Sequence, residues 1–290
     1  RQKMINYSIL GGIVLLLLII LLVLNAYRQK RKANQKLEQQ NKVITEQKDQ
    51  IEKKNQTIIS SIEYAKRIQE VTLTPQDKLK LYFTDSFLFY KAKDIVSGDF
   101  YWVSQPGGSS KDPIHSSAGS FKTESAILAV CDCTGHGVPG AFMSLLGFNM
   151  LKEVLQKNPY GSPADILIAL NTIVCNMLLQ QQDGIISPYG LDAALLKIDL
   201  NQKSLQYAGA HSPLYIIRKE ELLETKADSH PVGFKSVAGQ VPFTNHVVPI
   251  FTGDKIYIFS DGYADQMGGP ENRKLYGHHF RHILLSISTL

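Results

Sequence analysis

The sequence predicts an α+β domain with largely antiparallel strands, preceded by an apolar membrane-spanning helix and a polar helical segment. Met4–Tyr27 carries no charged residue, and that length allows a helix to cross a hydrocarbon core about 30 Å thick. Residues 33–70 repeat apolar side chains every seven positions, as coiled-coil helices do. Beyond Pro75, two adjacent helical patterns lie between runs of strand-like patterns. This order favours antiparallel sheets over repeating strand–helix–strand units.

The apolar segment is the first element in chain order, and we assign a transmembrane helix to residues 7–27. Residues 1–6 are then the end of a preceding region. A secretory signal is the alternative, but no small-residue cleavage site follows the apolar stretch. Five Lys or Arg residues follow the segment in residues 28–36, against two before it. This asymmetry predicts a single pass through the inner (cytoplasmic) membrane, with the C-terminal side in the cytoplasm.

Residues 28–72 form a predicted cytoplasmic helical linker with the character of a coiled coil. The repeating positions are Leu37, Ile44, Ile51, Ile58 and Ala65, followed four residues later by Asn41, Lys48, Asn55, Ile62 and Gln69. If the first set occupies d positions of a heptad, the second occupies a positions, where polar side chains lower stability but favour two-stranded pairing. We expect a parallel homodimer that carries a signal from the membrane. A solvated helical spacer is the alternative, because so polar a seam is marginal alone.

Residues 75–290 are predicted to be one domain. The expected strands are Phe83–Tyr90, Gly98–Val103, Ser125–Asp132, Asp192–Asp199, Ser204–Ala208, Leu214–Arg218 and Ile256–Ser260. The expected helices are Gly140–Gln156 and Pro163–Leu179. Residues 105–122 are rich in Gly, Ser and Pro and are typical of a loop. Because the chain begins at Arg1 and ends in a helix-like pattern over 279–285, we expect a fragment that is incomplete at both ends.

Charge and cysteine content exclude several classes of protein. Residues 1–70 hold 13 Lys or Arg and 6 Asp or Glu, so the basic excess lies beside the apolar segment. The rest of the chain holds 18 and 20 and is close to neutral, which argues against nucleic-acid binding. Three cysteines are too few for a disulfide scaffold. We therefore expect reduced thiols and no nucleic-acid partner.

Three acidic turns are the candidate chemistry of the domain. Asp99, Asp132 and Asp261 each lie at the edge of an apolar strand beside glycine or a glycine-rich turn. Clustered carboxylates raise one another's proton affinity unless a cation neutralises them, and hard oxygen ligands suit Mg²⁺ or Mn²⁺. The alternative is structural, because Asp-Gly is a common hairpin turn. Spacing alone leaves both interpretations open, and Gly135-His136-Gly137 lacks the full spacing of a nucleotide-binding loop.

The chain resembles the metal-dependent serine/threonine protein phosphatases of the PPM, or protein phosphatase 2C, superfamily. It is most similar to the bacterial branch that includes the stage II sporulation phosphatase and the regulators of sigma-factor activity. The motifs that carry the resemblance occur in family order, and they are Lys93–Trp102 (KDIVSGDFYW), Asp132–Ala141 (DCTGHGVPGA), Tyr207–Ala210 (YAGA) and Phe259–Gln266 (FSDGYADQ). Residues 61–69 resemble the helix that precedes this domain in membrane-anchored members.

The resemblance implies a fold in which two antiparallel β-sheets pack between helices, and a site that binds two Mn²⁺ or Mg²⁺ ions. In this family pattern Asp132 and Asp99 are the catalytic acids and, with Asp261 and the backbone carbonyl of Cys133, the metal ligands. The implied loop or supporting residues are Gly98, Gly135, His136, Gly137, Gly209 and Gly262. The implied reaction is direct attack of metal-bound water on phosphoserine or phosphothreonine of a partner protein, and the family analogue of that partner is an anti-sigma-factor antagonist.

One departure from the family pattern bears on activity. The family has a further metal-binding Asp near the end of the domain, and this chain ends at Leu290, before that position. We therefore expect weaker binding of the second metal in this fragment. A non-catalytic, membrane-anchored adaptor that binds phosphoproteins is the main alternative. A nucleotidyl cyclase is disfavoured, because its acids would need a different strand context and a purine-selective pair.

Overall fold

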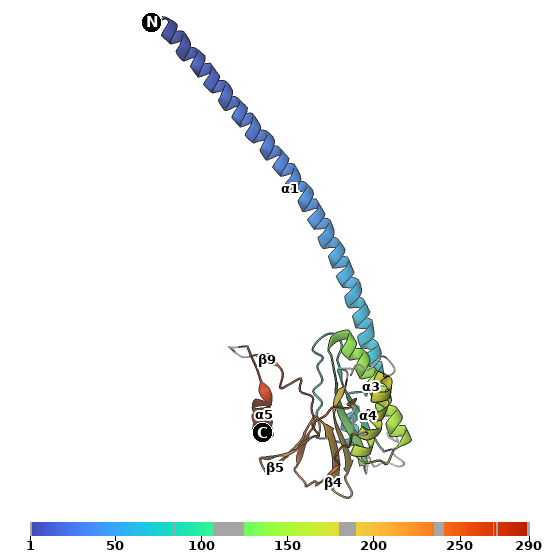
Figure 1. The fold of residues 1–290 in the computed structure, drawn as a ribbon. Coiled ribbons are helices and arrows are strands. Elements are labelled where there is room, and N and C mark those ends of the chain that lie inside the picture. The colour runs from blue at the N-terminus through green and yellow to red at the C-terminus, as the bar shows by residue number, and fades with distance from the viewer. Residues whose placement is uncertain are drawn as a thin grey trace. The chain divides into compact units, whose positions relative to one another are not determined.

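The computed structural model describes residues 2–83, 85–106, 125–179, 190–234, 241–268, 270 and 272–288. The chain divides into two compact units, Arg1–Ser61 and Ile62–Leu290. Helix α1 (Gln2–Thr72) makes up the first unit and continues into the second (Figure 1). It ends at Thr72, before Pro75, as the linker pattern predicts.

The first unit contains the apolar segment and most of the heptad pattern. By length and composition, α1 has one stretch apolar enough to cross a membrane, with a mean hydropathy of 3.0. The side chains of Leu37, Ile44, Ile51 and Ile58 are all more than half exposed in the single chain. A seam of this kind buries its apolar side chains only against a second helix. The membrane span and the pairing therefore stay predictions.

The second unit contains a five-stranded antiparallel sheet and a three-stranded one. The larger sheet has the order β1 (Asp99–Ser104), β2 (Ser125–Cys133), β3 (Leu191–Asp199), β4 (Ser204–Ala210) and β7 (His246–Pro249). The smaller sheet has the order β6 (Glu221–Thr225), β5 (Leu214–Arg218) and β8 (Lys255–Tyr257). A two-stranded ribbon joins β9 (Met267–Gly268) to β10 (Arg273–Lys274).

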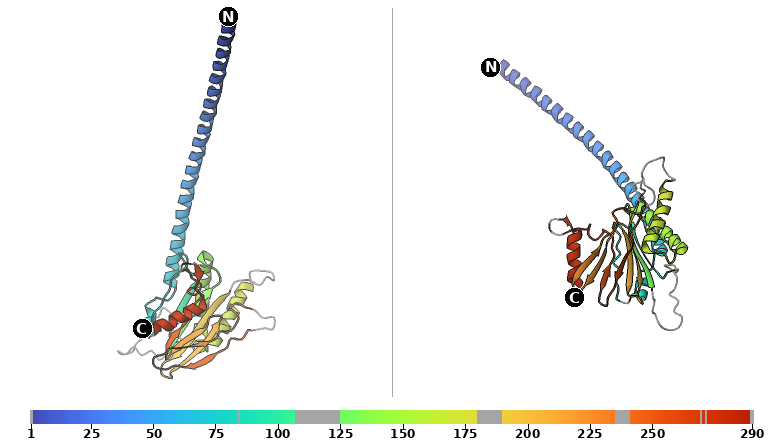
Figure 2. Two further views of the ribbon diagram at one scale, coloured as in Figure 1. Left: turned by 90° about the vertical axis from the view of Figure 1, so that its left-hand side faces the viewer. Right: turned by 60° about the horizontal axis from the view of Figure 1, so that its bottom comes forward.

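Helices cover the outer faces of the two sheets. Helices α3 (Gly137–Lys157) and α4 (Pro163–Leu179) lie against the five-stranded sheet, and α5 (Tyr276–Ser288) lies on the opposite side, near the three-stranded sheet (Figures 1 and 2). The short helix α2 (Lys78–Tyr82) follows α1. The expected α+β class, with two antiparallel sheets packed between helices, is confirmed.

Three apolar cores hold these layers together. The first lies between α3, α4 and the five-stranded sheet and includes the buried side chains of Phe100, Trp102 and Leu151. The second lies between the sheets and includes Leu196 and Tyr207. The third joins β5 to α5 through Tyr215, Ile217, Phe280 and Leu284. Burying each large apolar side chain contributes about 1.5–3 kcal/mol, so the cores fix which strand ends lie together.

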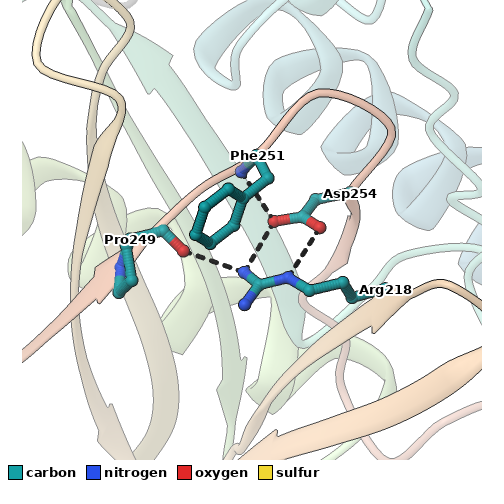
Figure 3. Close-up of polar contacts among 4 residues, drawn as sticks. All are labelled: Arg218, Pro249, Phe251 and Asp254. Carbon is teal, nitrogen blue, oxygen red and sulfur yellow. Dashed lines mark hydrogen bonds and ion pairs between the residues drawn. The ribbon is translucent and has the colours of Figure 1, made fainter.

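An ion pair links the two sheets at their far end. Arg218, at the end of β5, donates to both carboxylate oxygens of Asp254 at 2.9 and 2.8 Å and to the carbonyl of Pro249 in β7 at 2.9 Å (Figure 3). Its guanidinium lies 4.3 Å from the centre of the Phe251 ring. The Asp254 side chain is only 3% exposed. One side chain of the smaller sheet therefore anchors the edge of the larger sheet.

Two predicted strands differ in the structure. The described part of Phe83–Tyr90 forms no strand. Its aromatic side chains instead pack edge-to-face, Phe87 on Tyr257 and Phe89 on Tyr263. The alternating aromatic residues of this segment therefore make ring contacts and do not belong to a paired strand. The predicted strand Ile256–Ser260 is reduced to Lys255–Tyr257, which leaves Ser260 free to turn toward β1. Most of the predicted loop at 105–122 lies outside the described residues.

Candidate functional site

Strand register brings three acidic residues into a row at one end of the five-stranded sheet. Asp99 of β1 lies opposite Asp132 of β2, and Asp132 lies opposite Asp192 of β3. Residues that lie directly opposite each other on neighbouring strands share a face of the sheet, with their Cβ atoms about 5 Å apart. Like charges placed this way destabilise a sheet. The arrangement therefore indicates a functional site rather than a set of contacts that stabilises the sheet.

The turn after β8 adds a fourth acid. Asp261 shares a side-chain hydrogen bond with Asp132. The preceding residue, Ser260, donates a 2.8 Å hydrogen bond from its hydroxyl to a carboxylate oxygen of Asp99. The turn is closed by the backbone N–H of Asp265, which donates to the Asp261 carbonyl at 2.9 Å. Asp99 and Asp261, which lie far apart in the sequence, therefore both come next to Asp132 in the folded domain.

The electrostatics of the cluster centre on Asp132. Burial raises its pKa to about 8, and the negative charge of Asp99 and then that of Asp261 add to this effect. The pKa of Asp261 is also raised, first by partial burial and then by the charges of Asp265, Asp99 and Asp192, while its hydrogen bond with Asp132 opposes the shift. Near neutral pH, Asp132 therefore holds a proton between its two neighbours. A divalent cation would replace that proton and remove the repulsion.

The donor set suits such a cation chemically. Carboxylate oxygens and backbone carbonyls are the hard ligands that Mg²⁺ and Mn²⁺ prefer. Across the described part of the chain, no three His, Cys, Asp or Glu side chains already surround one point as a metal-binding group. The carboxylates instead meet in pairs through Asp132. The residues thus fit divalent-metal binding in type and in charge.

Cys133 enters the site through its backbone only. Its N–H donates to the Gly98 carbonyl at 3.4 Å, and its side chain is 1% exposed within the core below the sheet. Burial raises the pKa values of the Cys133 and Cys131 thiols well above the ordinary value. Both thiols are therefore neutral, and neither has the thiolate character of a nucleophile.

Three glycines allow the backbone segments around the acids to touch. A Cβ atom at Gly140, in the first turn of α3, would lie 2.4 Å from the Gly135 carbonyl oxygen. One at Gly98 would lie 2.7 Å from the same oxygen. Gly135 itself has φ +102°, a conformation that favours glycine. The start of β1, the turn after β2 and the start of α3 therefore pack without side chains between them.

The remaining predicted site residues lie at different distances from the acids. A Cβ atom at Gly262 would come within 3.9 Å of an Asp99 carboxylate oxygen, so Gly262 borders the cluster. Gly137 has φ +64° at the start of α3, where the exposed His136 ring pairs with Asp94 at 3.1 Å. Gly209 lies inside β4, where a Cβ atom would clash with the Tyr207 hydroxyl at 2.0 Å. His136 thus borders the site, and Gly209 makes room for Tyr207.

Sequence reasoning missed Asp192, His211 and Ser260. Asp192 pairs with His211 at 2.9 Å, and His211 has φ +58°. Ser260 precedes the predicted Asp261, but nothing in the sequence connects its hydroxyl to Asp99, 161 residues away. The available signal was that Asp192, like Asp132, lies at the end of an apolar strand.

Comparisons with known proteins agree with this fold. The family model described as stage II sporulation protein E (SpoIIE) matches residues 122–286. The SiaA-PP2C domain of Pseudomonas aeruginosa is similar, with 28% identity, 80% of this chain and 82% of that chain covered, and a TM-score of 0.66.

Two further solved structures align with TM-scores of 0.49. One holds the PP2C phosphatase domain and a fragment of the regulatory domain of SpoIIE from Bacillus subtilis, with 20% identity over 70% of this chain and 50% of that chain. The other holds the RsbU and RsbW domains of Rv1364c from Mycobacterium tuberculosis, with 17% identity over 69% of this chain and 48% of that chain. No curated protein sequence matches the chain. Because the family model spans more than half of the 290 residues, the chain belongs to the stage II sporulation protein E family and carries a PP2C-type phosphatase domain.

Proposed function

We propose that the chain is a metal-dependent protein phosphatase that hydrolyses phosphoserine or phosphothreonine on a partner protein. The observation that carries the proposal is the placement of Asp99 directly opposite Asp132, with Ser260, the residue before Asp261, hydrogen-bonded to the Asp99 carboxylate. Neighbouring like charges that no cation neutralises cost stability. Their retention in one cluster is explained by a cation that the folded protein binds.

The proposed metal ligands are the carboxylates of Asp99, Asp132 and Asp261 and the backbone carbonyl of Cys133. Two Mn²⁺ or Mg²⁺ ions bound there would lower the pKa of a water nucleophile and stabilise negative charge on the phosphoryl oxygens. The chain's own residues place these ligands. Ser260 orients the Asp99 carboxylate, and the contact of Gly98 and Gly140 with Gly135 fixes the backbone beside Asp132.

Nucleophilic catalysis by cysteine is a poor explanation of this site. Cys131 and Cys133 are each 1% exposed and face the core, and burial raises both thiol pKa values. Cys175 lies in α4, where its thiol contacts the Asn171 side chain and the Phe234 carbonyl. Direct hydrolysis, with no covalent phosphoenzyme, is the proposed route.

The substrate class follows from similarity rather than geometry. A phosphorylated protein is the substrate that the phosphatase fold suggests, and an anti-sigma-factor antagonist is the family analogue. We further propose that residues 7–27 span the inner membrane, with the phosphatase domain in the cytoplasm. The exposed apolar seam over Leu37–Ile58 supports homodimer formation through the linker.

The test is phosphate release from a phosphoserine peptide by the detergent-solubilised full chain during a Mn²⁺ titration. Release should depend on Mn²⁺ and fall by roughly a thousandfold or more in Asp132→Asn, because that variant loses a ligand at the reacting centre. Glu153→Gln is the matched control, since Glu153 is an exposed acid on α3 paired with Lys157. Mn²⁺ binding without any release, together with peptide binding, would instead establish a phosphoprotein-binding adaptor.

A further inference from the structure

Gln69, in the last turn of α1, is buried against the segment that carries Asp99. Its side chain is 4% exposed. The Nε2 group donates to the Ser97 carbonyl at 2.7 Å and to the Ser144 hydroxyl at 2.7 Å, and the Ser97 N–H donates to Oε1 at 3.2 Å. Every polar atom of the Gln69 amide therefore has a partner outside its own helix.

The two partners of Gln69 belong to the backbone that frames the acidic cluster. The Ser97 hydroxyl accepts a 3.0 Å hydrogen bond from the Asp99 N–H, and the Asp99 carbonyl accepts one at 3.1 Å from the Tyr90 hydroxyl. Ser144 lies in α3, one turn after Gly140. One buried amide thus connects the end of α1 to the Asp99 turn and to the helix that follows Asp132.

The position of Gln69 in the heptad pattern shows where α1 begins to pack against the domain. Gln69 continues the heptad stripe through Asn55, Ile58 and Ile62. That stripe is exposed at Ile58 and turns inward at Ile62 and Gln69. The prediction that Gln69 contributes to the helix-pairing seam is therefore wrong: within the second unit, its side chain is used by the domain itself.

A cavity lies beside the same three segments. It has a volume of about 450 Å³ and is lined by Ile62 of α1, by Asp94, Ile95 and Val96, and by Gly137 and Val138 of α3. The hydrogen bonds of Gln69 to Ser97 and Ser144 therefore supply a specific link among these segments.

We propose that Gln69 is a positioning residue of the metal site, and that its hydrogen bonds to Ser97 and Ser144 set the affinity of the site for divalent cations. The proposal rests on the proposed function, because it assumes that Asp99 is a metal ligand. Loss of these hydrogen bonds would then lower the affinity for the cation, with little effect on the reaction of the metal-loaded protein. A purely structural role for Gln69 would lower stability without a change in metal affinity.

The test measures Mn²⁺ binding separately from hydrolysis. The detergent-solubilised full chain and its Gln69→Met variant are titrated with MnCl₂, and binding is followed by the rise in melting temperature and by calorimetry. Methionine keeps the length of the side chain and removes all three hydrogen bonds. We expect the half-saturating Mn²⁺ concentration to rise roughly tenfold. The rate of phosphate release at saturating Mn²⁺ should stay within about twofold of wild type.

Two further variants sharpen the result. Ser144→Ala removes one partner only and should shift Mn²⁺ affinity in the same direction by a smaller factor; it also decides the question if Gln69→Met does not fold. Asn171→Leu is the matched control, because Asn171 is a buried amide that ties α4 to the backbone of Gly233 and Phe234, outside the network of Ser97 and Ser144. It should lower the melting temperature and leave the half-saturating Mn²⁺ concentration unchanged.

Three outcomes would overturn the proposal. They are equal Mn²⁺ affinity in wild type and Gln69→Met, an equal shift in the Asn171→Leu control, and absence of Mn²⁺ binding by wild type. Failure of the proposed function looks different. In that case wild type binds Mn²⁺ but releases no phosphate, and the melting-temperature titrations still decide the role of Gln69.

Discussion

The hydroxyl of Ser260 donates a 2.8 Å hydrogen bond to the carboxylate of Asp99, across 161 residues of sequence. This bond joins the first and last acidic motifs of the domain. It also orients one Asp99 oxygen, so that the carboxylate has a defined direction relative to Asp132. The site therefore depends on contacts between the two sheets as well as on the acids.

Removing this hydrogen bond should weaken metal binding as well as folding. Ser260→Ala loses one hydrogen bond to a charged group, which contributes about 1.5–3 kcal/mol, and leaves Asp99 free to rotate. We expect a severalfold higher half-saturating Mn²⁺ concentration in calorimetric titrations. Thr172→Ala is the control, since Thr172 is an exposed α4 residue whose hydroxyl bonds only within its own helix. Equal Mn²⁺ affinity in wild type and Ser260→Ala would show that Ser260 has no orienting role.

Asp132→Asn should stabilise the metal-free protein increasingly as pH rises from 5 to 8. The folded-state pKa of Asp132 is raised from an ordinary value of 3.8 to about 8. In that window the folded state holds a proton that the unfolded state has released, so wild-type stability falls as pH rises. Asparagine carries no charge and escapes this loss. With solvent screening discounted, the gain should reach about 2 kcal/mol near pH 8.

Urea denaturation in the presence of EDTA at pH 5, 6.5 and 8 measures this difference. Addition of Mn²⁺ should reverse the order of stability at pH 8, because only wild type keeps the ligand and gains binding energy. A stability gain that does not change with pH would contradict the proposed repulsion among the carboxylates.

Gly140→Ala should destabilise the domain although it lies in a helix. Alanine normally favours a helix over glycine by about 1 kcal/mol. At this position the added Cβ atom would lie 2.4 Å from the Gly135 carbonyl oxygen, and such overpacking costs about 1–3 kcal/mol. Gly277→Ala in α5 is the matched control, because nothing lies within 4 Å of a Cβ atom there. Thermal unfolding should show a lower melting temperature for Gly140→Ala only.

Arg218→Met should destabilise the second unit at pH 7, because it removes both hydrogen bonds from Arg218 to the Asp254 carboxylate, whose side chain is 3% exposed. Arg218 also holds the pKa of Asp254 below its ordinary value. A depressed folded-state pKa stabilises the protein fully above about pH 4, and this contribution is lost as pH falls further. The difference between wild type and variant in urea denaturation should therefore shrink below pH 4. Lys157→Met, which breaks an exposed pair with Glu153, should cost less than about 1 kcal/mol at any pH.

Ile51→Lys combined with Ile58→Lys should dissociate the proposed homodimer. The two changes place charge in the seam, where apolar d positions support pairing. Native mass spectrometry or chemical crosslinking in detergent measures the dimer fraction. Gln50→Lys with Thr57→Lys is the control, since these residues lie one position before the seam and add the same number of positive charges. If pairing sets activity through Gln69, the seam variant should also show altered Mn²⁺ affinity.

Much of the fold could be predicted because local patterns are strong in this chain. The apolar run before Asp132 specifies a buried strand, and the bounds of α4 agree with the prediction at both ends. Phe83–Tyr90 failed because alternating aromatic residues fit a strand and a ring-packing segment equally well. The pattern cannot say whether the partner is another backbone or a set of tyrosine rings.

The sequence identified most of the acidic residues of the candidate site, but it did not show which residues lie next to one another. Asp99, Asp132 and Asp261 were identified from strand ends and motifs, and the structure places Asp99 and Asp261 next to Asp132; their role as metal ligands stays a prediction. Asp192 was missed because only the register between β2 and β3 places it opposite Asp132. Gln69 was assigned to a helix-pairing seam because heptad spacing does not reveal where a helix begins to pack against its own domain.

Local sequence patterns specify the elements and the side chains available for chemistry: a long helix, two further helices between runs of strands, and acids at strand ends. These depend on periodicity and side-chain type, which act within a few residues. Only the tertiary structure decided that Ser260 contacts Asp99, that Asp192 joins the row of acids, and that Gln69 contacts Ser97 and Ser144. Such contacts form when sheets and helices bury their apolar faces together. Their geometry therefore belongs to the packing of the whole domain and to no single segment of the chain.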